Sequence, residues 1–170
     1  MRYRVLDGVP ETASPATLAD SSRPAFEESR SQVTPAPLVS CLARIEPDSV
    51  ALLSAALVVT DFPTPTVIDR INVTELGLLA PSILVVDVDR LDVDPLEMLR
   101  MVRFVLPACL IVVYTDVLTH EWAVSCHLAG TNCLLSKTSD DVAIVYGLQR
   151  ALSTGCFTDP SFTESGVPAA

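Results

Sequence analysis

The chain has 170 residues and a formal net charge of −10, with 21 acidic residues against 11 basic ones. Hydrophobic residues make up 49 % of it and charged residues 19 %, a balance that suits one domain with a buried core and excludes disorder along the whole length. A nucleic-acid-binding surface is not expected, because neutralising phosphates requires a basic patch. Ten of the basic residues are arginine, and the only lysine is Lys137.

The five cysteines have irregular spacings, and no pair reads C-x-x-C. This pattern favours free thiols in a reducing compartment over a disulfide framework. The apolar runs are only as long as strands, so no membrane span is expected. No apolar segment follows the first residues, so a signal peptide is not predicted either. We therefore expect a cytoplasmic protein.

The chain is expected to contain one folded domain with a tail at each end. Residues 1–36 carry four prolines and show no hydrophobic period, so a disordered N-terminal tail is predicted there. Residues 37–162 are expected to fold, and residues 163–170 to form a flexible C-terminal tail.

The stretch 37–81 allows two interpretations. The first has a strand at 38–42, a helix at 48–55, a second strand at 56–60 and a crossover helix at 66–79. The second has strands at 56–59 and 66–71, followed by a short helix that Asn72 and Glu75 cap. A parallel crossover usually takes at least about ten residues. Because the second interpretation leaves fewer between its strands, we favour the first, and both stay open.

Three apolar runs follow, at residues 83–86, 110–114 and 133–135. Runs that are apolar on both faces are typical of parallel strands covered by helices. Each run is followed by a helical pattern with its own start and stop signals. The expected signals are Asp94 and Pro95 for the first helix, Thr119 and Gly130 for the second, and Ser139 or Asp140 and Gly155 for the third. The alternation predicts an α/β fold with a doubly wound parallel sheet.

Polar residues stand where these strands end. Asp87, Thr115 and Lys137 follow three strands, and in open parallel sheets the site lies at the carboxyl ends of the strands. A carboxylate can act as a nucleophile toward a phosphoryl group, while an ammonium and a hydroxyl can hold the phosphoryl oxygens. Carboxylates close by would hold the Mg²⁺ that such transfer normally requires.

These segments resemble the receiver domains of response regulators. The sequence ILVVDVDRLDVDPLE at 83–97 resembles the phosphoacceptor segment, in which an aspartate ends the third strand. AGTNCLLSK at 129–137 resembles the run into the fifth strand and its lysine, and VVYT at 112–115 resembles the fourth strand. Residues 152–160 resemble the end of receivers of the NarL/FixJ type. The resemblance implies a CheY-like, flavodoxin-like fold with strand order 2-1-3-4-5.

The resemblance also implies a function. It is two-component phosphorelay signalling, with Asp87 accepting the phosphoryl group and Thr115 and Lys137 binding it; the only enzymatic activity implied is slow autodephosphorylation. A histidine kinase or phosphotransfer protein would be the donor and another protein the output partner, and homodimer formation stays open. The alternative is a degenerate pseudo-receiver that acts as a protein–protein interaction module without phosphorylation.

The sequence departs from the family where the metal would bind. Receivers carry an acidic pair after the first strand to hold Mg²⁺. Under the first interpretation of 37–81 that place is Ala43-Arg44, which cannot bind a cation. Under the second, one acid remains as Asp61, and Asp87 with Asp61 would form the metal site. The aromatic residue of the fifth strand is replaced by Leu134.

Overall fold

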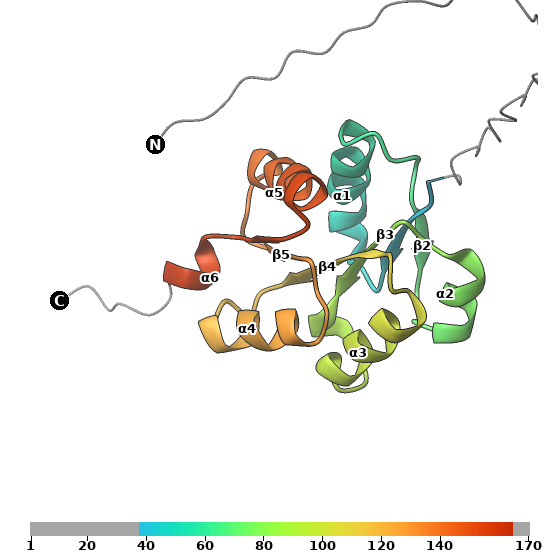
Figure 1. Cartoon of the computed structure of the whole chain (residues 1–170). Coiled ribbons are helices and arrows are strands. Elements are labelled where there is room, and N and C mark those ends of the chain that lie inside the picture. Colours follow the sequence, from blue (N-terminus) through green and yellow to red (C-terminus); the bar gives the residue numbers. More distant parts are fainter. Residues whose placement is uncertain (1–37, 165–170) are drawn as a thin grey trace, which may run out of the picture. The chain divides into compact units, whose positions relative to one another are not determined.

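The computed structural model describes residues 38–164, in which strands and helices alternate (Figure 1). Within these residues, six parallel strands form one sheet in the order β2-β1-β3-β4-β5-β6. The strands are β1 (Ser40–Ala43), β2 (Thr66–Ile68), β3 (Ile83–Asp87), β4 (Leu110–Thr115), β5 (Cys133–Ser136) and β6 (Phe157–Thr158). The predicted α/β sheet of order 2-1-3-4-5 is confirmed, and β6 adds an edge strand beyond β5.

Helices cover both faces of the sheet. They are α1 (Pro47–Val59), α2 (Val73–Leu79), α3 (Pro95–Val105), α4 (His120–Leu128), α5 (Asp141–Thr154) and α6 (Ser161–Glu164), and a 3₁₀ turn η1 (Val88–Arg90) follows β3. Figure 1 shows α1 and α5 on one face and α2, α3 and α4 on the other. No helix between residues 38 and 164 is long and apolar enough to cross a membrane.

The central strands are buried on both faces, which explains their unbroken apolar sequence. Successive side chains of a strand point to opposite faces. Val85 and Val112 accordingly belong to the core cluster under α1 and α5, whereas Val86 and Val113 belong to the cluster under α2, α3 and α4. This double cover fixes β3 and β4 and therefore the residues at their carboxyl ends.

The expected helix starts are confirmed by their caps. The side chains of Asp94, Thr119 and Asp140 each accept a hydrogen bond from a backbone N–H in the first turn of α3, α4 and α5. Gly130 and Gly155 follow α4 and α5 with φ of 101° and 83°, in the left-handed region where glycine has no steric penalty.

The stretch 37–81 combines the two interpretations. Its first strand and first helix are those of the first interpretation. The second strand expected at 56–60 is wrong, because residues 56–59 complete α1 and Thr60 is its C-cap. Ala56 and Leu57 are buried on the same helical face as Leu53, while Val58 is 52 % exposed. That pattern follows a helical period rather than the alternation of a strand. The second strand is β2, and Asn72 caps α2 with Glu75, as the second interpretation had it.

The C-terminal part of the described chain closes one side of the domain. The N–H of Phe157 in β6 donates to the Asn132 carbonyl over 2.9 Å. The Phe162 side chain is 1 % exposed and belongs to the core cluster that includes α4 residues. Because α6 extends to Glu164, the chain is helical past the boundary expected at residue 162. The predicted N-terminal tail and residues 165–170 lie outside the described residues.

Candidate functional site

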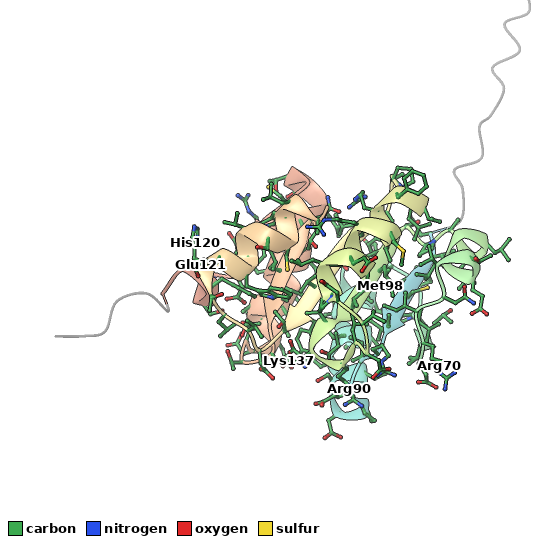
Figure 2. All side chains as sticks on the ribbon, turned by 90° about the horizontal axis from the view of Figure 1, so that it is seen from below. Arg70, Arg90, Met98, His120, Glu121 and Lys137 are labelled. Carbon is green, nitrogen blue, oxygen red and sulfur yellow. The ribbon has the colours of Figure 1, made fainter. Side chains whose placement is uncertain are left out.

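Three polar side chains stand at the carboxyl edge of the sheet. Asp87 ends β3, Thr115 ends β4 and Lys137 follows β5 directly. The backbone N–H of Lys137 donates to the Thr115 carbonyl over 3.1 Å, so the lysine is fixed to the neighbouring strand end. Figure 2 shows Lys137 along the same edge of the domain as Arg90, which belongs to η1. The structure thus brings together the residues that the sequence analysis placed at the strand ends.

Lys137 joins two carboxylates at this edge. Its Nζ lies 2.8 Å from Oδ1 of Asp87 and 3.0 Å from Oδ2 of Asp89, a residue of η1. The Asp87 side chain has 0 % exposure and that of Lys137 has 13 %. Nζ also lies 5.9 Å from the centre of the Tyr114 ring, within the range of a cation–π contact. One ammonium therefore pairs with two carboxylates, of which Asp87 is fully buried and Asp89 is partly exposed to solvent.

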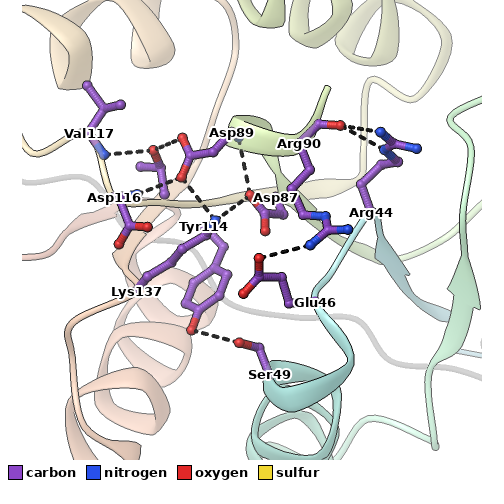
Figure 3. A network of polar contacts seen from close by, with 11 residues as sticks. Arg44, Glu46, Ser49, Asp87, Asp89, Arg90, Tyr114, Asp116, Val117 and Lys137 are labelled. Atoms are coloured by element: carbon purple, nitrogen blue, oxygen red, sulfur yellow. Dashed lines mark hydrogen bonds and ion pairs between the residues drawn. The ribbon is translucent and has the colours of Figure 1, made fainter. Parts of the chain in front are cut away.

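Asp89 is the centre of the hydrogen-bond network (Figure 3). Its Oδ1 accepts from the Thr115 hydroxyl over 2.6 Å, and its Oδ2 accepts from the Asp116 backbone N–H over 2.8 Å. The Thr115 Oγ1 in turn accepts from the Val117 N–H over 3.0 Å. The Thr115 hydroxyl therefore donates to Asp89 and not to Asp87, and Asp89 connects the β3–α3 loop to the β4–α4 loop.

Only one of the two carboxylate oxygens of Asp87 has hydrogen-bond partners among residues 38–164. Its Oδ1 accepts from Lys137 and from the Asp89 N–H, the latter over 3.2 Å. Its Oδ2 is buried and has no hydrogen-bond partner among residues 38–164. Burial, which disfavours the charged carboxylate, raises the pKa of Asp87 above its usual value, although Lys137 opposes this. An unpaired buried oxygen is costly and often marks a functional site.

The pKa values of Asp89 and Lys137 shift in the directions expected of an ion-pair cluster. Burial alone would raise the pKa of Asp89, but the hydrogen bonds from Thr115 and Asp116 and the charge of Lys137 outweigh it, so the pKa is lowered. Burial alone would lower the pKa of Lys137, but Asp87 and Asp89 outweigh it, so the pKa is raised. At neutral pH the lysine is therefore an ammonium and Asp89 a carboxylate.

Arg44 occupies the place after β1 where receivers carry acids. Its Nε and Nη2 donate to the Arg90 carbonyl over 2.8 and 2.5 Å, and its Nη1 donates to the Asp69 carbonyl over 3.1 Å. Its Nη2 also lies 3.1 Å from Oδ2 of Asp92. Arg44 has φ 61°, a left-handed conformation that is uncommon for residues other than glycine. The guanidinium thus ties the loops after β2 and β3 to the end of β1.

The side chains at this edge do not fit a Mg²⁺ site. Mg²⁺ needs several oxygen ligands in near-octahedral geometry. Within 38–164, no group of three or more acidic, histidine or cysteine side chains is placed to hold a metal ion. Asp87 and Asp89 already share Lys137, and Arg44 is a cation where the family has acids. The expectation of Mg²⁺ binding finds no support in these residues.

The structure also separates Asp61 from Asp87, so the metal site expected from these two residues is wrong. Asp61 follows α1, which begins after the carboxyl end of β1 and has 13 residues. A helix of that length is about 20 Å long, so it carries the chain back to the amino edge of the sheet, where β2 begins. Asp61 would reach the site only if 56–59 were the first strand, as the second interpretation of that stretch assumed.

Sequence reasoning missed Asp89, the Asp116 N–H and the interactions of Arg44. The spacing of Asp89, two residues after the strand-end aspartate, was a usable signal, because a residue there lies in the same loop. The Asp116 contact is made by the backbone, which no residue type reveals. The hydrogen bonds of Arg44 depend on its left-handed conformation, and no glycine or asparagine marked that position.

No protein-family model matches the sequence, and no curated protein matches it. Solved structures do resemble it. A two-component response regulator of the LuxR family from Aurantimonas is 19 % identical with a TM-score of 0.59, covering 75 % of this chain and 94 % of its own. The receiver domain of RcsB from Salmonella enterica, with the phosphomimetic BeF3⁻, is 14 % identical with a TM-score of 0.62, covering 75 % and 96 %.

A third similar structure carries a different description. It is a putative pilus assembly-related protein from Burkholderia pseudomallei, 18 % identical with a TM-score of 0.53, covering 72 % of this chain and 93 % of its own.

The class defined by the sheet order and the strand-end site is the flavodoxin-like α/β fold. Within that class, the described residues have the fold of CheY-like receiver domains of response regulators. Function has to be argued from the site, because a fold alone does not specify it.

Proposed function

We propose that this chain is a receiver module of two-component signalling and accepts a phosphoryl group on Asp87. The observation that carries the proposal is the 2.8 Å contact between Lys137 Nζ and Asp87 Oδ1 at the carboxyl edge of the sheet. The Thr115 hydroxyl and the Asp116 N–H meet in the same network through Asp89. Donors that converge in a buried site can stabilise the oxygens of a transferred phosphoryl group.

The transfer is a nucleophilic displacement at phosphorus. A carboxylate oxygen of Asp87 attacks the phosphorus of a phosphohistidine on the donor protein. An O–P bond forms, the P–N bond breaks, and its electron pair stays on the imidazole nitrogen. Oδ2 is the better candidate for attack, because Oδ1 is held by Lys137 while Oδ2 has no partner in the described chain. Asp87 has no exposed surface, so the β3–α3 loop opens before the donor reaches it.

The partners follow from this role. A histidine kinase or a phosphotransfer protein would supply the phosphoryl group, and another protein would read the output, in the manner of NarL/FixJ-type receivers. The net charge of −10 disfavours nucleic acid as the output partner. Whether the protein acts as a monomer or a homodimer would be measured on the same samples by light scattering.

A small phosphodonor tests the proposal without knowledge of the kinase. The protein is incubated with acetyl phosphate, with and without Mg²⁺, and its intact mass is recorded. The unchanged protein gains one phosphoryl group, Asp87→Asn gains none, and Asp92→Asn, which alters an exposed acid of the same loop, behaves like the unchanged protein. An unchanged mass under conditions that phosphorylate a known receiver would overturn the proposal.

The side chain of Arg44 favours a second candidate, a pseudo-receiver that binds its partner without phosphorylation. A guanidinium stands where a metal-binding acid would be needed, and it is held by three hydrogen bonds to backbone carbonyls. The discriminating variant is Asp87→Ala. Unchanged partner binding and signalling in that variant would favour the interaction module, whereas their loss would favour phosphoacceptance.

A further inference from the structure

The groups suited to hold a phosphoryl group are already bonded to a carboxylate. The Thr115 hydroxyl, the Asp116 N–H and the Lys137 ammonium all contact Asp89, over 2.6, 2.8 and 3.0 Å. These donors come from the end of β4, the loop after it and the end of β5. They converge on the two oxygens of one side chain, although that side chain is two residues away from the proposed acceptor.

This arrangement resembles the way an anion is bound. A phosphoryl group brings a charge of about −1.5 to −2 and three acceptor oxygens. It would require the same ammonium, N–H and O–H donors that the carboxylate now uses. Both cannot use them at once. Two anions that compete for one set of donors also repel each other, because like charges disfavour the ionised forms.

We propose that Asp89 is a built-in occupant of the phosphoryl pocket, and that its carboxylate must leave Thr115, Asp116 and Lys137 before Asp87 can hold a phosphoryl group. This inference rests on the proposed function and names the residue that regulates it. Asp89 acts as a positioning residue, because it does not itself take the phosphoryl group. It slows phosphorylation, and while it stays in place it also holds the loop after β4 in a fixed arrangement.

The protein contains a matched control for this role. Asp92 lies in the same β3–α3 loop as Asp89, but its side chain is 87 % exposed and pairs with Arg44. Asp92→Asn changes the net charge of the protein and of the loop as much as Asp89→Asn does. It removes no contact of Thr115, Asp116 or Lys137.

The experiment follows phosphorylation over time. The unchanged full-length protein, Asp89→Asn, Asp89→Ala and Asp92→Asn are incubated with acetyl phosphate, and the phosphorylated fraction is measured by intact mass. Asp89→Asn and Asp89→Ala are expected to react at least tenfold faster than the unchanged protein, which corresponds to about 1.4 kcal/mol of activation free energy. Asp92→Asn is expected to react at the unchanged rate. Circular dichroism of each variant verifies that it is folded.

The outcomes separate this inference from the function on which it rests. A gain of rate in both Asp89 variants, with an unchanged rate in Asp92→Asn, supports it. An unchanged or lower rate in the Asp89 variants, with normal phosphorylation of the unchanged protein, overturns the role of Asp89 and leaves the proposed function standing. No phosphorylation in any of the four proteins overturns both. In Asp89→Ala, hydrogen exchange at the Asp116 amide is expected to rise, because that amide loses its acceptor.

Discussion

Lys137 Nζ lies 2.8 Å from Oδ1 of Asp87, a side chain with no exposed surface. The pair stands between two strand ends of a parallel sheet, where an isolated charge would be strongly disfavoured. Lys137 is the only lysine of the chain. Its position explains why an ammonium stands here among ten arginines, since a compact ammonium can approach two carboxylates where a planar guanidinium could not adopt the same geometry.

Replacing this lysine should therefore destabilise the protein. Lys137→Met leaves the buried Asp87 carboxylate without its cation, and breaking a buried pair in this way costs about 3–5 kcal/mol. Urea unfolding at pH 7 measures the loss. The double variant Asp87→Asn/Lys137→Met should lose less than Lys137→Met alone, because the buried charge of Asp87 is then removed as well. Only Asp89 is left without Lys137, and it keeps its hydrogen bonds from Thr115 and Asp116. An equal loss in the two proteins would show that the ion pair does not carry the effect.

The same variant has a predicted pH dependence. Burial raises the folded-state pKa of Asp87, so the stability contributed by this group is fully present below its unfolded pKa of about 4 and is lost as the pH rises through the folded value. Without Lys137 the folded pKa rises further. Lys137→Met should therefore regain stability relative to the unchanged protein as the pH falls from 7 toward 4, which urea unfolding at several pH values would detect.

Arg44 allows a test that separates its side chain from its backbone. Arg44→Ala removes the hydrogen bonds to Arg90 and Asp69 and should cost about 1–2 kcal/mol. Arg44→Gly loses the same bonds, but glycine has no steric penalty at φ 61°, which is worth about 1 kcal/mol or more. The glycine variant should be the more stable of the two in urea unfolding. An alanine variant as stable as the glycine variant would contradict the left-handed conformation of this residue.

The C-terminal segment is expected to depend on Asp159. Burial acts to raise the pKa of Asp159, but hydrogen bonds from Ser139 and Ser161 outweigh it and lower the pKa. Such a carboxylate contributes stability above its unfolded pKa of about 4, and the contribution is lost as the pH falls through the folded value. Asp159→Asn should be destabilised at pH 7, and its difference from the unchanged protein should shrink at pH 3.

A matched carboxylate serves as the control for that prediction. Asp69 is exposed and lies in the loop after β2, so Asp69→Asn should follow the unchanged protein at each pH. Thermal unfolding at pH 7, 5 and 3 measures all three proteins. A destabilisation of Asp159→Asn that is the same at every pH would show that the negative charge of Asp159 is not what holds α6.

Gly147 tests the packing of α5 against the sheet. A Cβ at this position would lie 2.7 Å from Leu135 and 2.7 Å from Phe157, which belong to β5 and β6. Gly147→Ala should therefore destabilise the protein by about 1–3 kcal/mol through overpacking, although alanine is the better helix former. Urea unfolding of Gly147→Ala beside Gly147→Ala/Phe157→Ala checks the cause. Gly147→Ala should cost less stability in the Phe157→Ala background than in the unchanged protein. An equal cost in both backgrounds would show that the close contact with Phe157 is not responsible.

Much of the fold could be predicted because its signals are local. Asp94, Thr119 and Asp140 cap helices with their own side chains, and each cap lies within a few residues of the turn that it stabilises. The strand predicted at 56–60 was wrong because a short apolar run fits both a buried strand and a buried helix. Only the packing of Leu53 and Leu57 against the sheet decides between them.

The site was predictable only in its strand-end residues. Asp87, Thr115 and Lys137 could be placed because parallel strands end at one edge. The contacts of Asp89 with Thr115 and Asp116 depend on how η1 turns after β3. The hydrogen bonds of Arg44 depend on loops that are distant in sequence. Such tertiary contacts leave no periodicity in a single sequence.

The most direct test of the account is the position of the phosphoryl group. The protein is treated with acetyl phosphate and reduced with borohydride, which converts a phosphoaspartate to homoserine, and the modified residue is located by peptide mass spectrometry. Homoserine is expected at position 87, and Asp89 is expected to stay unmodified. Modification of Asp89, or a fully unmodified protein beside a known receiver that reacts, would contradict it.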